Sequence, residues 1–248
     1  MTGVKLNKRL LATLAVILCI VSLAISTVKG QTIVPGVTPG DDFDYHTTSY
    51  WTTSDSYASI PSGLIDINQT LHAEVRISTV NATNIDTFSA YYAANGTAFS
   101  GRGNINLLTG TSYGDFVAII GANLNAGDKI HPDGTDGITI KETVDRSYES
   151  GTRSTNHISN SVRNDTAGYT ATRDLYFDKA TGMLVEQVER TDVDNPRSTT
   201  IVTWKIVSAS VWSIPEFPVI IALPAFLIAT SLAVIAYKKK HINSPIKL

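Results

Sequence analysis

The chain has 248 residues, of which 43% are hydrophobic, and a formal net charge of −2. Residues 31–213 carry 12 lysines and arginines against 21 aspartates and glutamates, a net charge of −9 for this segment. Such an acidic surface argues against nucleic acid and anionic lipid as partners. The single cysteine, Cys19, lies outside this segment, so a hydrophobic core rather than disulfides must hold it together.

An apolar run near the start is typical of a secretory signal. Leu10–Val28 contains no charged residue and follows three basic residues. A basic start, an apolar middle and small residues after it mark a chain for export. We therefore expect residues 1–30 to form a cleaved signal peptide, with an uncleaved signal anchor as the alternative. Residues 31–40, rich in proline and glycine, are expected to form a linker.

Alternation of apolar and polar residues dominates residues 41–213, which we expect to form one extracellular β domain. The stretch "LHAEVRISTV", from Leu71, has the period of two that is typical of a half-buried strand, and "ITIKETVDRSY", "YTATRDLYF" and "TTIVTWKIVSASVW" repeat it. The apolar run "FVAII", Phe116–Ile120, predicts a strand covered on both faces. No helical period is convincing in this segment. The prediction is an all-β fold with one antiparallel domain, either a sandwich or a curved half-barrel.

Turn signals separate the expected strands. Asn95-Gly96 predicts one hairpin, and Asp178–Gly182 predicts another in which Gly182 can adopt a positive φ. Four asparagines begin an Asn-x-Ser/Thr sequence and are candidate glycosylation acceptors: Asn68, Asn81, Asn95 and Asn164.

One loop offers oxygen ligands for a metal. The stretch "HPDGTDG", His131–Gly137, places Asp133 and Asp136 around glycines, and calcium prefers several oxygens on a tight loop. The spacing matches neither the EF-hand pattern nor the Asp-rich β-roll repeats, so a solvated hairpin turn is the alternative that we favour. The histidines are scattered and lack metal-ligand spacing, so no other cofactor is expected.

The motifs of common enzyme classes are missing from the sequence. There is no Gly-x-Ser-x-Gly elbow, no P-loop and no dinucleotide fingerprint. We therefore predict a protein that is not an enzyme, although a surface hydrolase with a triad of distant residues stays as an alternative. The many tyrosines, together with Trp51, are expected to pack on the sheet. The alternative is a binding face for sugar or protein.

The C-terminal region predicts a membrane anchor. Residues 214–218 form a proline-rich stalk, and residues 219–237 contain no charge. A bilayer core of about 30 Å requires roughly 20 helical residues, so this run can span it. Three lysines begin the tail at 238–248 and place it in the cytoplasm. We expect a single-pass protein of the cell membrane with its domain facing outside.

Two stretches resemble known protein groups. The C-terminal "IPEFP", apolar span and "KKK" resemble the anchors of archaeal cell-surface proteins, including PEF-type sorting signals. Ala122–Glu186, with "NLNAGD" and "YFDKATG", is similar to a group of uncharacterised archaeal exported proteins. The half-barrel alternative resembles the LolA-like lipoprotein carriers. The second group has no known activity to transfer. From the membrane topology, the acidic cysteine-free domain and the missing catalytic motifs, we expect an anchored surface protein that is structural or binds an extracellular protein, glycan or other ligand. A carrier of an apolar ligand is the alternative.

Overall fold

The computed structural model describes residues 31–212 and contains one antiparallel sheet of ten strands. In space the strands follow the order β5-β4-β3-β2-β1-β10-β9-β8-β7-β6. The predicted all-β antiparallel fold is therefore confirmed. The strands are β1 (Asp42–Thr53), β2 (Thr70–Asn81), β3 (Asn84–Ala93), β4 (Ala98–Asn106), β5 (Ser112–Gly114), β6 (Glu142–Tyr148), β7 (Gly151–Asn164), β8 (Tyr169–Asp178), β9 (Leu184–Asp194) and β10 (Arg197–Ala209).

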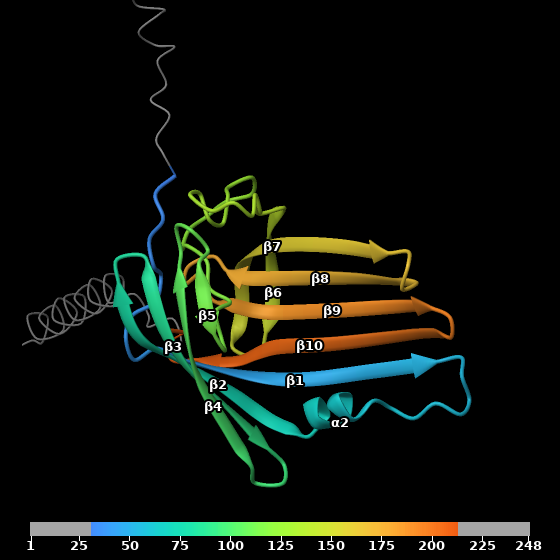
Figure 1. Cartoon of the computed structure of the whole chain (residues 1–248). Helices are drawn as coiled ribbons and strands as arrows, with labels where there is room; N and C mark the ends of the chain where they lie inside the picture. Colours follow the sequence, from blue (N-terminus) through green and yellow to red (C-terminus); the bar gives the residue numbers. More distant parts are fainter. Residues whose placement is uncertain (1–30, 213–248) are drawn as a thin grey trace, which may run out of the picture.

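The sheet consists of two meanders, β1–β5 and β6–β10, which meet where β1 pairs with β10. Figure 1 shows that the sheet bends, so that β2–β5 run at a steep angle to the long strands β7–β10. A connection of residues 115–141 joins β5 at one edge to β6 at the other. This crossover segment supplies core side chains that pack with those of the sheet: Phe116, Ile119, Ile120, Leu124, Ile130 and Ile140.

The predicted alternation is confirmed in β2. Ala73, Val75 and Ile77 are fully buried, and the residues between them are half-buried or exposed. Leu71 was expected on the same apolar face but is 62% exposed. The reason is a shift of the pairing between β2 and β3 at this position, which moves Leu71 out of the alternation.

Two other segments differ from the sequence-based expectation. Phe116–Ile120 is not a strand of the sheet but lies in the crossover segment, where Ile119 forms only an isolated bridge with Met183. Its pairing is limited because it meets the β8–β9 turn rather than a full strand. Residues 31–40 were expected to be a linker, yet Ile33 and Val37 are buried in the core. Apolar burial thus holds this segment against the body.

Both predicted hairpins are confirmed. Gly96, between β3 and β4, has a φ of +84°, and Gly182, between β8 and β9, has a φ of +74°. The Asp178 side chain closes the second turn by accepting hydrogen bonds from the backbone and hydroxyl of Thr181. A Cβ at Gly182 would lie 2.0 Å from the carbonyl oxygen of Ile120. The turn therefore needs glycine for both its φ and the close approach of the crossover segment.

One short helix, α2 (Ser62–Asn68), was not expected. Leu64 is its buried residue, and seven residues are too few for a clear helical period in the sequence. Within residues 31–212, no helix is both long and apolar enough to cross a membrane. The expected signal at 1–30, and the stalk, span and tail from 214 to 248, lie outside the described residues.

Candidate functional site

The sheet divides into two halves that differ in what lies against the inner face, the face that carries Tyr45 and Trp204. In the covered half, the crossover segment packs on this face. The open half consists of the remaining ends of five strands, and no residue in it is buried. We define it as residues 48–53 of β1, 159–164 of β7, 169–173 of β8, 189–194 of β9 and 197–203 of β10.

A cleft of about 380 Å³ lies where the crossover segment begins. Its walls come from β3, β8, β9, β10 and the crossover segment, and include the apolar side chains of Tyr91, Phe116, Leu175 and Trp204. A second depression of about 400 Å³ lies between α2 and the β3–β4 hairpin and also contains Tyr91. Because the two share this side chain, we treat them together as the concave cleft.

Aromatic rings line the concave cleft. The ring centroids of Tyr91 and Trp204 lie 5.8 Å apart, with the rings at 84° to each other. Tyr45 lies behind them, with centroids 6.5 Å from Trp204 and 5.6 Å from Phe116. The Tyr45 hydroxyl donates to the Leu184 carbonyl at 2.8 Å, and burial raises the pKa of Tyr45 well above its ordinary value. A neutral, hydrogen-bonded tyrosine thus supports the aromatic wall.

Charged groups stand at the margin of the cleft. Arg173 pairs with the Glu189 carboxylate at 2.9 Å and donates to the Gln187 side chain at 3.1 Å. Asp115, at the start of the crossover segment, is exposed. Burial raises the pKa of the Tyr91 phenol, and the negative charge of Asp115 adds to this rise. The cleft therefore combines an apolar aromatic interior with a polar rim, as small-molecule sites commonly do.

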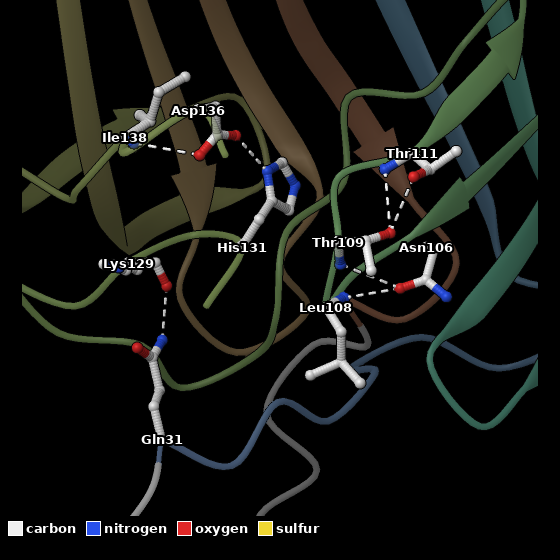
Figure 2. A network of polar contacts seen from close by, with 9 residues as sticks. All are labelled: Gln31, Asn106, Leu108, Thr109, Thr111, Lys129, His131, Asp136 and Ile138. Atoms are coloured by element: carbon white, nitrogen blue, oxygen red, sulfur yellow. Dashed lines mark hydrogen bonds and ion pairs between the residues drawn. The ribbon is translucent and has the colours of Figure 1, made fainter. Parts of the chain in front are cut away.

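The two aspartates of the predicted calcium loop do not form a set of free oxygen ligands. Figure 2 shows Asp136 between His131 and Ile138: one oxygen lies 2.6 Å from His131 Nδ1 and the other accepts the backbone N–H of Ile138. Partial burial opposes ionisation of Asp136, but these hydrogen bonds lower its pKa. Asp133 is exposed, and its backbone N–H donates to the Leu108 carbonyl. Among residues 31–212, no three His, Cys, Asp or Glu side chains are grouped to hold a metal.

The four glycosylation candidates occupy different settings. Asn68 pairs with the backbone of Ser49 through both its amide oxygen and its amide nitrogen, which attaches α2 to the edge of β1. The oxygens of Asn95 and Asn164 accept backbone N–H groups within their own turns. Asn81 is exposed at the β2–β3 turn. The Asn68 amide is therefore engaged in the fold, whereas Asn81 and Asn95 lie on exposed turns.

A polar cluster on the opposite face of the sheet joins three strands. His157 is buried, with Nδ1 2.9 Å from Glu142 and Nε2 2.9 Å from Asp174. Its ring stacks on Tyr176 with centroids 4.4 Å apart, and the Arg146 guanidinium lies over the other side of Tyr176. Because carboxylates occupy both nitrogens of His157, neither is free to bind a metal or to accept a substrate proton. We assign this cluster to stability.

Comparisons with known proteins do not assign a role to the cleft: no protein-family model matches the chain, and no curated protein matches it. Sequence reasoning also missed the cleft, because Tyr91, Asp115, Arg173 and Trp204 lie on separate segments. The available signal was Trp204, a large aromatic side chain at an inward position of a strand that was predicted from its alternation.

Proposed function

We propose that this chain is a membrane-anchored protein of an archaeal cell surface whose extracellular β domain binds a ligand with an apolar body. The concave cleft would hold the ligand, and the domain would not be catalytic. In this proposal the bent sheet is a curved half-barrel, and the domain would carry its apolar ligand. The anchor rests on the uncharged run at 219–237 with its lysines, and the exported domain rests on the apolar run near the start.

The observation that carries the binding proposal is the aromatic surface left uncovered at the concave cleft. Phe99 lies beside Tyr91 across the β3–β4 pair and is 65% exposed. Covering apolar surface contributes about 25 cal/mol per Å², so a ligand over these rings would gain favourable free energy. The two volumes, about 380 and 400 Å³, fall in the range of small-molecule sites, which is roughly 300–1,000 Å³.

The side chains of the cleft support binding rather than catalysis. In the described part of the chain, its walls contain no histidine, cysteine or serine. The Arg173 guanidinium already pairs with the Glu189 carboxylate and donates to the Gln187 side chain. A hydrolase needs a nucleophile, a base and an orienting group that converge on one point. The residues of this cleft instead resemble those that hold a ligand by its apolar surface.

The test uses the full-length chain in lipid nanodiscs with the fluorescent apolar probe N-phenyl-1-naphthylamine. We expect saturable fluorescence beyond that of empty nanodiscs, and at least about a tenfold loss of affinity in Leu175→Arg. Phe99→Arg, at an exposed site, should also weaken binding without affecting folding. Val162→Arg is the matched control, since Val162 is 53% exposed and lies in the open half. Equal probe binding by wild type and both cleft variants would overturn the binding proposal.

The topology is tested separately. Protease treatment of intact cells should release the domain from the membrane, because the linkage near residues 213–218 lies outside in the proposed orientation. Protease resistance in intact cells, with cleavage only after lysis, would show that the orientation is wrong.

A further inference from the structure

We propose that the ligand of the concave cleft is an organic cation, a primary amine or quaternary ammonium with an apolar body, and that Asp115 supplies the opposite charge. This inference rests on the proposed binding function and specifies the class of ligand. Three observations support it: the position of Asp115, the existing ion pair of Arg173 with Glu189, and the aromatic rings that line the cleft.

The Asp115 carboxylate lies directly on the inner face of β4. A Cβ at Gly101 would lie 1.3 Å from one of its oxygens, so a side chain at that position would displace the carboxylate. The Asp115 backbone N–H donates to the Arg102 carbonyl at 3.1 Å, which holds the start of the crossover segment to this strand. Among residues 31–212, the Asp115 carboxylate forms no ion pair and accepts no side-chain hydrogen bond. Its charge is therefore available to a ligand.

Among residues 31–212, the one cationic side chain that lines the cleft already pairs with a carboxylate. Arg173 uses Nε for Glu189, at 2.9 Å, and a terminal nitrogen for Gln187, at 3.1 Å. An anionic ligand would compete with Glu189 for Arg173 and would also meet the negative charge of Asp115. A cation meets neither obstacle, and the net charge of −9 between residues 31 and 213 would attract it to the domain.

The aromatic rings supply the second half of a cation site. The faces of Tyr and Trp rings carry partial negative charge and attract ammonium groups within about 6 Å of the ring centroid. Tyr91 and Trp204 stand nearly perpendicular to each other and line the same cleft as the Asp115 carboxylate. The adjoining depression offers Ile67 and Phe99 for the apolar remainder of the ligand.

The test is isothermal titration calorimetry of the full-length chain in nanodiscs with three probes of similar size: benzyltrimethylammonium, benzyl alcohol and benzenesulfonate. We expect the cation to bind at least about tenfold more tightly than the other two. Asp115→Asn, which removes the charge and keeps the shape, should abolish this preference, and added salt should weaken cation binding in the wild type. Asp165→Asn is the matched control, because Asp165 is also acidic and its side chain is 88% exposed in the β7–β8 turn.

Three results would overturn the inference and leave the proposed binding function intact. The first is equal affinity for benzyl alcohol and the cation. The second is a preference for the cation that survives in Asp115→Asn. The third is tighter binding of benzenesulfonate, which would make Arg173 the charged contact. If none of the three probes binds, the cation site is refuted. The naphthylamine titration then decides whether the cleft binds any apolar ligand.

Discussion

The covered and open halves of the sheet contain parts of the same strands but are stabilised differently. In β10, Ile206 is 1% exposed in the covered half, whereas residues 199–202 in the open half are only half-buried. Ion pairs such as Arg163–Asp194 and Arg190–Asp192 link exposed side chains in the open half. Strand pairing continues through both halves, so the crossover segment makes the difference. Burial within one sheet therefore follows what covers its inner face, and we expect local stability to follow burial.

The largest expected effect comes from shortening a core side chain of the crossover segment. Ile119→Ala should lower the free energy of unfolding by about 2–5 kcal/mol, because it removes buried methyl groups and leaves a cavity. Val202→Ala is the comparison on the inner face of the open half and should cost clearly less, because Val202 is only half-buried. The measurement is chemical denaturation of the full-length chain in detergent, followed by tryptophan fluorescence. Equal losses for the two variants would refute the distinction between the halves.

A glycine of β4 tests the fit of the crossover segment against the sheet. A Cβ at Gly103 would lie 2.5 Å from the backbone oxygen of Phe116, so Gly103→Ala should destabilise the protein by about 1–3 kcal/mol. Gly63 has no atom within 4 Å of such a Cβ and lies in α2. Gly63→Ala should instead stabilise by about 0.5–1 kcal/mol, since alanine favours helix. The midpoint of thermal unfolding reports both changes, and a loss in both variants would contradict this assignment.

An ion pair on the outer face of the covered half should contribute more to the free energy of unfolding than an ion pair in the open half. Arg146 binds the Glu186 carboxylate at 2.8 Å, and the Glu186 side chain is only 9% exposed. Glu186→Gln keeps the shape but removes the charge, and should cost about 1–2 kcal/mol because the neighbouring Arg146 loses its partner. Asp192→Asn breaks an exposed pair with Arg190 and should leave the denaturation midpoint unchanged. Equal effects would show that burial does not distinguish these pairs.

The smallest expected effect is a dependence on acid. Partial burial opposes ionisation of Asp174, but its hydrogen bonds with His157 and Ser159 lower its pKa below the ordinary value. Such a carboxylate stabilises the fold above its unfolded-state pKa, and this stabilisation is lost as the pH falls through the lower folded-state pKa. The free energy of unfolding should therefore decline below about pH 4. In Asp174→Asn this decline should be shallower, and an unchanged profile would contradict the assignment.

Sequence reasoning worked where side chains obey a local rule. The alternation around Val75 predicted a strand, and Gly96 and Gly182 marked hairpins because each turn requires a positive φ. It failed where a distant partner decides the outcome. Phe116–Ile120 is apolar enough for a strand, but it meets the β8–β9 turn and stays irregular. Ile33 and Val37 lie in a stretch whose composition predicts a linker, but both side chains are buried in the core.

The candidate cleft could not be predicted in the same way. Its aromatic side chains were visible in the sequence, but nothing local indicated that Tyr91 and Trp204 would meet at 5.8 Å. The aspartates of the predicted calcium loop, Asp133 and Asp136, lie where His131 and the backbone N–H of Ile138 already form hydrogen bonds with the oxygens of Asp136. Proximity in the sequence suggested a calcium site at Asp133 and Asp136, whereas proximity in space brings together the side chains of the candidate cleft.

The sequence by itself determined the class of fold, the positions of the main strands and turns, and the acidic character of residues 31–213. These follow from alternation, turn chemistry and charge, which act over a few residues or simply add along the chain. The tertiary structure decided which strands are neighbours, which half of the sheet is covered, and where Asp115 lies relative to the aromatic rings. Those features depend on contacts between residues far apart in the chain, and local preferences contain no information about such pairings.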